Sequence, residues 1–532
     1  MSISKVSALL IILLAAASAN GADIDTIGAT LLRQVSPGLT GNGISVGQVE
    51  APISAGTPPP FEVNPGAAGV NQPTNLFTWI SSSGTAITFT NTVGTESGHA
   101  DAVAGNFYGN TTNGVAPGVA HVDNYEANFF SDNYIASPQA IPDRVVNQSF
   151  VYDADVNGTH YPSNVEATID SEYDDAATQY GVLFVSGAGN AGTVYPAATC
   201  YNGIGVGVYP GNSSTAPTYN GRSKPDLVAP GGGVTSFSTP LVAGSAALLI
   251  QAALRGDGGS DTASASDNRT IKALILNGAI KPAGWTNGVT TPLDARYGAG
   301  VLNVFNSWSQ LTGGKRAFIE STSVLDGQPH PPGSNPGNVP VLTGWDLNSI
   351  TSPDPLHDKI NHYYFNLTGS HVYTLTATLT WQRPHTVVPA QPMSINDLNL
   401  FLYNTANGNL VLCSTSMVDN VEHLTLPSLP PGRYDLQVQK NPNGEVSPSE
   451  TYALAFEFFN IALTVRQTNN NNLVISWPLA PQGFKLASSS SINPSATWAP
   501  VTSPVTADTS ANRDVVTVPM TGAVQFFRLQ RP

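Results

Sequence analysis

Charged side chains are scarce in this sequence. Asp, Glu, Lys and Arg make up 11% of the 532 residues, against roughly a quarter in an ordinary globular protein. Basic residues are the scarcer kind, with 21 Lys and Arg against 36 Asp and Glu, and the formal net charge is −15. No cluster of Lys and Arg is present that could grip a phosphate backbone, so the composition argues against a nucleic-acid partner.

Cysteine is almost absent, with two examples at Cys200 and Cys413. The sequence contains no group of Cys and His at metal-ligand spacing, which argues against a zinc site. In an oxidising compartment the two thiols can form a bridge, and two separate thiols fit their positions equally well. Apolar runs of roughly 18 residues are lacking after the N-terminus. We therefore expect no membrane contact once the N-terminal segment is removed.

The first residues follow the pattern of a secretory signal peptide. Lys5 precedes an apolar run that ends near Ala17, and Ala17-Ser18-Ala19 is a small-residue cleavage site. The apolar run is short for a membrane span, although an uncleaved anchor is the alternative. We expect a signal peptide at residues 1–19 and a mature protein that is secreted, either free outside the cell or associated with its surface.

Glycine and proline are abundant, with 50 and 41 residues, which predicts many turns and short strands. Hydrophobic residues make up 41% of the chain, enough to build real cores. At roughly 100–200 residues per domain, the length predicts two to four domains.

Residues 23–312 alternate between short apolar runs and helix-like stretches. Residues 44–49, 145–147 and 182–185 are short, mainly apolar runs of the kind typical of strands buried on both faces. Helices are expected at 98–106 and at 241–254, the second beginning after Pro240, because proline is favourable at a helix start. This alternation predicts an α/β domain with a mostly parallel central sheet.

The composition changes near Thr312. Residues 313–341 include a Pro- and Gly-rich connector, which predicts an extended linker. Beyond it the apolar residues recur at every second position, which predicts a β-sandwich over 342–460 and a small β-domain over 461–532. Expected strands lie at 373–381, 398–403, 434–438, 463–466, 472–477, 515–518 and 526–529.

Three polar residues of the first domain have patterns that suit acyl transfer. Ser236 lies between a glycine-rich turn and an expected helix, whose free N–H groups and partial positive charge favour a developing oxyanion. An N-cap serine is the alternative. His99 opens a small apolar helix, and imidazole suits proton transfer near neutral pH. Asn190 ends a buried strand, where its amide can donate to an oxyanion or simply form a turn.

Four segments in this order resemble the subtilisin family of serine peptidases. They are Gly43-Ile-Ser-Val-Gly-Gln-Val-Glu50, Gly98-His99 through Gly105, Ser186-Gly-Ala-Gly-Asn190, and Lys224-Pro-Asp-Leu-Val-Ala-Pro-Gly231 with Thr235-Ser-Phe-Ser-Thr-Pro240. The order acid, histidine, serine is the subtilisin order. The resemblance implies a subtilisin-like α/β domain followed by β-rich domains of the kind found in secreted bacterial peptidases.

The resemblance also implies roles for single residues. Ser236 is expected to be the nucleophile that forms an acyl-enzyme, His99 the general base and then acid, and Asn190 part of the oxyanion hole. Ser149 is expected to pair with extended substrate backbone, and Gly187 and Gly189 to line the specificity pocket. The implied function is a secreted serine endopeptidase that hydrolyses polypeptides, with no cofactor and no metal at named residues. A monomer is assumed.

Two features depart from the family pattern. The family's orienting acid is Asp, whereas this sequence has Glu50, whose extra methylene moves the carboxylate by about 1.5 Å unless the backbone adjusts. Phe150 and Tyr152 stand where the family commonly has glycines and are expected to narrow the cleft. The alternative function is therefore a catalytically weak or inactive binding or adhesion module. Asp397 is a candidate calcium ligand, with a surface turn as the alternative.

Overall fold

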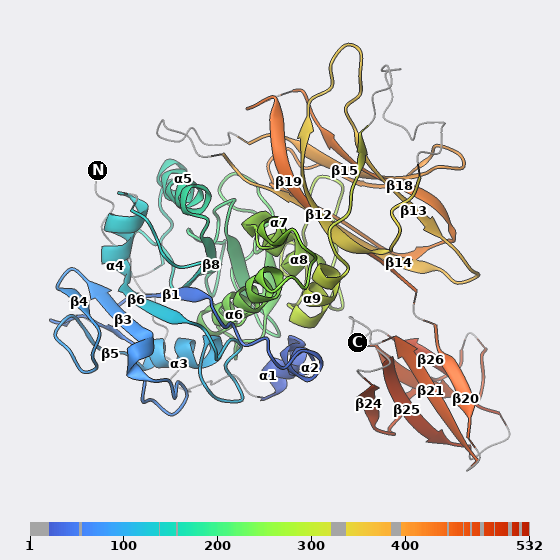
Figure 1. Cartoon of the computed structure of the whole chain (residues 1–532), viewed down its shortest axis with the longest axis horizontal. Helices are drawn as coiled ribbons and strands as arrows, with labels where there is room; N and C mark the ends of the chain where they lie inside the picture. Colours follow the sequence, from blue (N-terminus) through green and yellow to red (C-terminus); the bar gives the residue numbers. More distant parts are fainter. Residues whose placement is uncertain are drawn as a thin grey trace.

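The computed structural model describes residues 21–52, 56–137, 139–155, 158–320, 337–384, 395–443, 446–460, 462–468, 471–478, 484–493, 495–508, 513–520 and 524–530. The expected signal peptide at 1–19 lies outside this part of the chain, as do residues 321–336 of the expected linker. Figure 1 shows three bodies in chain order: an α/β body in blue to green, a β body in yellow to orange and a smaller β body in red.

The α/β body is built on one sheet with the strand order β10-β9-β8-β7-β1-β6-β3-β4. Its strands are β1 (Ser45–Glu50), β3 (Phe77–Ser81), β4 (Gly84–Ala86), β6 (His121–Glu126), β7 (Val145–Gln148), β8 (Leu183–Gly187), β9 (Ile204–Val208) and β10 (Leu227–Ala229). Every pairing is parallel except that of β3 with the edge strand β4. The prediction of a mostly parallel sheet is confirmed.

The strand order places β1 at the centre of the sheet, between β6 and β7. The chain leaves β1 toward one side of the sheet, returns at β6, and then continues on the other side at β7. At such a reversal the loops after neighbouring strands separate and leave a crevice at the carboxyl ends of the strands. Glu50 is the last residue of β1, so it lies at this crevice.

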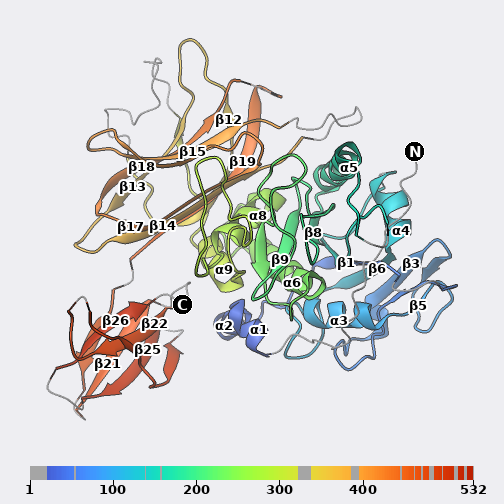
Figure 2. The same cartoon turned by 180° about the vertical axis from the view of Figure 1, so that it is seen from behind.

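Helices cover both faces of the sheet, because strands this apolar must be buried on both sides. The helical segments of this body are α1 (Gly21–Thr26), α2 (Ala29–Val35), η1 (Thr74–Leu76), α3 (Gly98–Phe107), α4 (Ala127–Phe130), η2 (Ser131–Ile135), α5 (Ser163–Tyr180), α6 (Thr235–Leu254), α7 (Thr262–Ala265), α8 (Asn268–Asn277) and α9 (Val304–Thr312). The short strands β2 (Pro60–Glu62) and β5 (Thr95–Glu96) pair beside the start of α3. Figure 2 shows the same bodies from behind.

The central helix α6 begins earlier than predicted. The expected helix started after Pro240, whereas α6 starts at Thr235 and contains Pro240 in its interior. Proline has no N–H for the carbonyl four residues earlier, which normally breaks a helix. Here that carbonyl, of Ser236, accepts a hydrogen bond from the Ser149 hydroxyl at 2.8 Å. The substitute donor comes from the residue that follows β7, which the local sequence could not predict.

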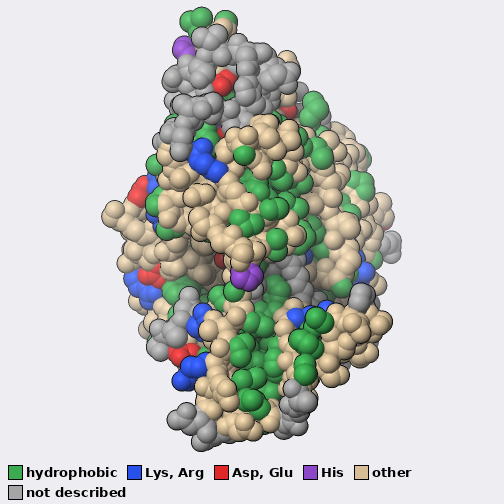
Figure 3. Space-filling view, turned by 90° about the vertical axis from the view of Figure 1, so that its right-hand side faces the viewer, with side chains coloured by type: hydrophobic (Ala, Val, Ile, Leu, Met, Phe, Trp, Pro, Cys, Tyr) green, Lys and Arg blue, Asp and Glu red, His purple; other side chains and the backbone are tan. Residues whose placement is uncertain are grey.

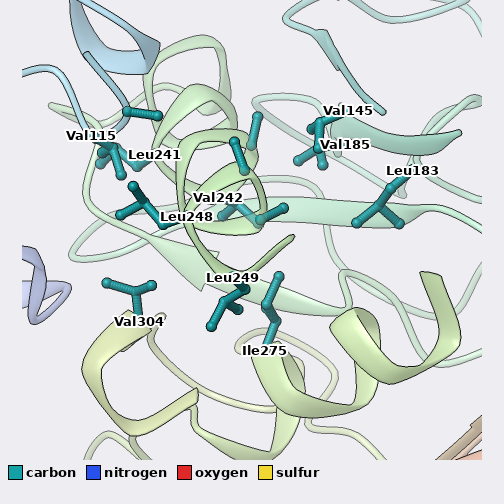
Figure 4. Close-up of a cluster of buried hydrophobic side chains, with 14 of the residues drawn as sticks. Val115, Val145, Leu183, Val185, Leu241, Val242, Leu248, Leu249, Ile275 and Val304 are labelled. Carbon is teal, nitrogen blue, oxygen red and sulfur yellow. The ribbon is translucent and has the colours of Figure 1, made fainter. Parts of the chain in front are cut away.

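The apolar length of α6 is explained by its burial. It is long and apolar enough to cross a membrane, with mean hydropathy 1.5, but 89% of that window is buried inside the protein. Figure 4 shows Val242 pointing toward Val185 of the sheet and Leu249 toward Ile275 of α8. We conclude that α6 is the core helix of the α/β body.

The second body is a sandwich of two antiparallel sheets. One has the order β11-β13-β18-β15-β16 and the other β12-β19-β14-β17. The strands are β11 (Ile319–Glu320), β12 (Thr343–Thr351), β13 (Asn361–Leu367), β14 (Tyr373–Trp381), β15 (Leu398–Asn404), β16 (Leu410–Ser414), β17 (Val421–Leu429), β18 (Gly432–Lys440) and β19 (Ser449–Phe459). The expected strands 373–381, 398–403 and 434–438 are β14, β15 and part of β18.

The sandwich is packed directly on the α/β body. Its strand β14 is buried along its whole length, although its residues alternate between apolar and Thr. The Thr face meets α8, where the hydroxyls of Thr376 and Thr378 both donate to Asn277 Oδ1 at 2.9 Å. Trp345 and Ala453 of the sandwich belong to the same buried cluster as α6. The core of the α/β body therefore extends into the sandwich, which also has a hydrophobic core of its own between its two sheets.

The third body consists of two small antiparallel sheets, ordered β20-β21-β25-β24 and β23-β22-β26. Its strands are β20 (Thr464–Gln467), β21 (Asn472–Pro478), β22 (Lys485–Ser489), β23 (Ala499–Pro500), β24 (Val505–Asp508), β25 (Arg513–Pro519) and β26 (Phe526–Gln530). The four strands predicted here match β20, β21, β25 and β26, and the structure adds β22, β23 and β24. Its own core is centred on Ile475 and Trp477.

The surface matches the low charge of the sequence. Figure 3 shows scattered Lys, Arg, Asp and Glu among a majority of uncharged side chains.

Both cysteines are unpaired, with Cys200 buried and Cys413 half-buried. Of the two alternatives left open by the sequence, the structure has the separate thiols.

Candidate active site

Glu50 and His99 are brought together by the ends of two neighbouring elements. Glu50 ends β1 and is buried, with a side chain 1% exposed. His99 lies in the first turn of α3, whose N-cap Ser97 accepts a hydrogen bond from Ala100 N. His99 Nδ1 lies 2.7 Å from Glu50 Oε2. With this nitrogen donating to the carboxylate, the other ring nitrogen, Nε2, is the one left to accept a proton.

The contact with Glu50 sets the charge preference of His99. Burial alone lowers the pKa of the imidazole, but the charge of Glu50 and its hydrogen bond outweigh burial and raise the pKa above its usual 6.5. A Glu in place of Asp thus reaches the ring and stabilises the imidazolium electrostatically. Asp101 is the next carboxylate along α3, two residues after His99, and its Oδ1 accepts a hydrogen bond from Asn64 N at 2.7 Å.

The second carboxylate oxygen of Glu50 has a partner that sequence reasoning missed. Gln48 Nε2 donates to Glu50 Oε1 at 2.8 Å and also to Ala100 O at 2.9 Å. The Tyr108 hydroxyl donates to Gln48 Oε1 at 2.6 Å. Residues 48 and 50 share one face of β1 because side chains alternate along a strand. The one signal in the sequence was a Gln in the middle of an expected buried strand.

Ser236 is the second residue of α6 and is half-buried. Its Oγ donates to Ser149 O at 3.3 Å, while Ser149 Oγ donates to Ser236 O. Among the hydrogen bonds of the described residues, none joins Ser236 to His99. The ring of Phe237, the residue after Ser236, lies 6.0 Å from the His99 ring between centroids, so the starts of α3 and α6 face each other. Catalytic hydrogen bonds are often long in a protein without substrate.

Asn190 is exposed just beyond the end of β8 and is tied to the start of α6. Its Oδ1 accepts from Thr235 N at 2.9 Å and from Thr235 Oγ1 at 3.1 Å. These two bonds hold the amide oxygen of Asn190 against Thr235, the residue before Ser236, so the NH₂ group of the amide is turned away from Thr235. A donor in this place can serve an oxyanion.

The remaining predicted residues lie around the same crevice. Ser149 follows β7 and contacts Ser236 in both directions, as described above. Gly187 ends β8, and a Cβ there would lie 3.2 Å from Thr235 Oγ1, so this glycine lets α6 pack closely on the strand. Gly189 has φ +104°, and a Cβ would lie 2.6 Å from Ser214 Oγ. The structure thus places all the predicted residues at the carboxyl ends of β1, β7 and β8 or on α3 and α6.

Phe150 and Tyr152 do not stand in an open cleft, contrary to expectation. They are 8% and 2% exposed and belong to the buried cluster that includes Tyr173 of α5. The Tyr152 and Tyr173 hydroxyls lie 2.7 Å apart. The aromatic residues in the glycine positions therefore fill the core beneath the crevice.

No group of three or more His, Cys, Asp or Glu suited to a metal ion occurs in the part of the chain that the structure describes. Asp397, the candidate calcium ligand, is 9% exposed, and its Oδ2 accepts from Asn441 Nδ2 at 2.7 Å. This contact supports a structural role for Asp397 in joining two segments of the sandwich.

Comparisons with known proteins show a family similarity over part of the chain. Residues 81–300 match the model of the subtilase family, a segment that includes His99, Asn190 and Ser236. Among solved structures, the chain is similar to a serine protease of Aeromonas sobria, with 13% identity, 92% of this chain and 89% of that chain covered, and a TM-score of 0.32. It is also similar to PliG of Aeromonas hydrophila, a periplasmic inhibitor of g-type lysozyme, with 14% identity, coverage of 22% and 84%, and a TM-score of 0.15. No curated protein matches the chain.

Proposed function

We propose that this chain, whose residues 81–300 match the model of the subtilase family, is an active serine endopeptidase with Ser236, His99 and Glu50 as its triad. The observation that carries the proposal is the 2.7 Å contact between Glu50 and His99 beside the helix start that bears Ser236. This contact is the one that the acid of a triad must make, because it holds the ring in the tautomer that leaves Nε2 to accept a proton.

The proposed reaction follows from the positions of these groups. Ser236 Oγ attacks the peptide carbonyl while His99 Nε2 takes the hydroxyl proton, and Glu50 holds the ring and stabilises its positive charge. The oxyanion accepts from Asn190 Nδ2 and from the N–H of Ser236, which has no partner within the first turn of the helix. His99 then gives its proton to the leaving amine, and water releases the acyl group by the same route.

The hydrogen bond from Ser236 to Ser149 O describes the protein before substrate binds. In the proposal, extended substrate backbone pairs at Ser149, and the Ser236 hydroxyl turns from that carbonyl toward His99. Gly187 and Gly189 bound the specificity pocket. The proposed site of action is outside the cell, and the support for it is the signal-like segment at residues 1–19.

The alternative is a binding module that keeps the fold without the reaction. The observation that favours it is that Ser236 bonds to Ser149 O rather than to the imidazole. Under this alternative the crevice holds a polypeptide segment that is not cut.

Hydrolysis of an unfolded, fluorescently labelled protein by the full chain tests the proposal. We expect cleavage by the wild type, and loss of at least about 10³-fold in Ser236→Ala and His99→Ala. Ser245→Ala is the matched control, because this buried serine of the same helix donates to Leu241 O at 2.8 Å, away from the crevice. If folded wild type binds the substrate without cutting it, the binding-module alternative is correct.

A further inference from the structure

Both polar groups of the buried Gln48 amide are hydrogen-bonded inside the protein. It is 0% exposed, both hydrogens of its nitrogen are donated, and its oxygen accepts from Tyr108. A buried amide with every group satisfied is held in one orientation. One of its two donated hydrogens goes to the acid of the proposed triad and the other to the helix that carries His99.

We infer that Gln48 and Tyr108 are positioning residues that hold the Glu50 carboxylate against His99. This inference rests on the proposed function, because it assigns to the two residues the task of making a Glu work at an Asp position. The relay runs from Tyr108 Oη through Gln48 to Glu50 and then to His99, with contacts of 2.6, 2.8 and 2.7 Å.

The need for such a clamp follows from the length of the Glu side chain. Glu has one more rotatable bond than Asp, so more rotamers must be excluded before the carboxylate stays beside the ring. Gln48 fixes Oε1, which leaves Oε2 directed at His99 Nδ1. Gln48 also bonds Ala100 O in the first turn of α3, so the distance between acid and histidine is set by one side chain.

Tyr108 determines which end of the Gln48 amide faces the carboxylate. Its hydroxyl is buried, and burial together with the charges of Glu50 and Asp101 raises its pKa well above the usual 10, so it remains a donor. A donor at Gln48 Oε1 keeps the NH₂ group toward Glu50. Without it, a half-turn of the amide would bring oxygen against oxygen, which is repulsive.

A buried glutamine can also be a purely structural tie, and this chain contains such a residue for comparison. Gln251, at the far end of α6, donates to Gly38 O and accepts from Thr40 N and Gly41 N at 2.8–2.9 Å. It has as many hydrogen bonds as Gln48, and these partners lie outside the proposed triad. Tyr363, buried in the sandwich with its hydroxyl on Asp346 Oδ2 at 2.8 Å, is the corresponding match for Tyr108.

The experiment measures the second-order rate of fluorophosphonate labelling of the full chain as a function of pH. Because Glu50 raises the pKa of His99, a misplaced carboxylate must lower both the plateau rate and the midpoint of the rise with pH. We expect Gln48→Met to lower the plateau about 10- to 100-fold and the midpoint by up to about one pH unit. Tyr108→Phe should lower the plateau about 3- to 10-fold, with a shift in the same direction.

The controls separate the possible outcomes. Gln251→Met and Tyr363→Phe should lower the urea midpoint of unfolding and leave the rate per folded molecule and the pH midpoint unchanged. The inference is overturned if Gln48→Met or Tyr108→Phe lowers the plateau rate without a shift of the pH midpoint. It is also overturned if both the plateau rate and the pH midpoint stay at their wild-type values. If Gln48→Met does not fold, Tyr108→Phe alone decides, since it removes a single oxygen. Failure of the proposed function is recognised separately, because then the folded wild type is not labelled at all.

Discussion

Shortening the acid by one methylene is the sharpest perturbation of the proposed site. In Glu50→Asp the carboxylate withdraws by about 1.5 Å from a position 2.7 Å from His99 Nδ1. The contact then exceeds about 3.2 Å, the outer limit of a good hydrogen bond. The backbone cannot easily follow, because β1 is paired on both sides, with Glu50 in register with Glu126 of β6.

The expected cost follows from this geometry. A misplacement of ~1 Å in a catalytic group can cost ~10²-fold in rate, which corresponds to about 2.7 kcal/mol of transition-state stabilisation. The assay is kcat/KM on a peptide substrate, with urea unfolding measured in parallel. Glu126→Asp is the matched control, since Glu126 ends the neighbouring strand and caps α4 through Asn128 N and Phe129 N. Activity in Glu50→Asp equal to or above wild type would refute the reasoning.

The remaining predictions concern single residues. The labelling rate should rise with pH to a midpoint above 6.5, because the pKa of His99 is raised. By linkage, the stability that protonated His99 contributes is present below pH 6.5 and is lost as the pH rises through the folded-state pKa of His99. Urea unfolding of the wild type and of His99→Gln across about pH 5–9 checks this pH dependence. Ser149→Ala leaves Ser236 O without its donor and should lower the free energy of unfolding by about 1–3 kcal/mol. In a Pro240→Ala background the loss should be much smaller, because the restored N–H of residue 240 replaces the Ser149 hydroxyl. Equal losses in the two backgrounds of this double-mutant cycle would contradict the prediction. Asn190→Ala should lower kcat about 10²- to 10³-fold with little change in KM, and an unchanged kcat would remove Asn190 from the oxyanion hole. Thr378→Val removes bonds to Asn277 of the α/β body and to His423 of the sandwich, so urea unfolding should show about 1–3 kcal/mol less stability, with kcat per folded molecule unchanged.

The sequence predicted the elements that carry Glu50 and His99 to within one residue at each end. Both are signalled locally, by an apolar run in one case and by a small-residue helix in the other. The start of α6 was predicted wrongly because proline was assigned its usual effect, and the compensating donor, Ser149, is 87 residues away in sequence. Long-range hydrogen bonds of this kind leave no local pattern.

The environment of the site was harder to predict than its residues. The signal from Gln48 was weak, since a polar residue in a buried strand has many explanations until Tyr108 and Glu50 are seen around it. The aromatic residues at 150 and 152 were expected in the cleft because their position relative to Ser149 was known and their direction was not. Likewise, the alternation of residues 373–381 predicted the strand β14, and only the packing of α8 accounts for the burial of its Thr face.

Peptide mapping by mass spectrometry after fluorophosphonate treatment of the full chain tests the central claim most directly. The account predicts one adduct, on Ser236, that forms faster as pH rises and is absent from Ser236→Ala but present in Ser245→Ala. A folded wild-type protein that carries no adduct, or an adduct on another residue in place of Ser236, would contradict it.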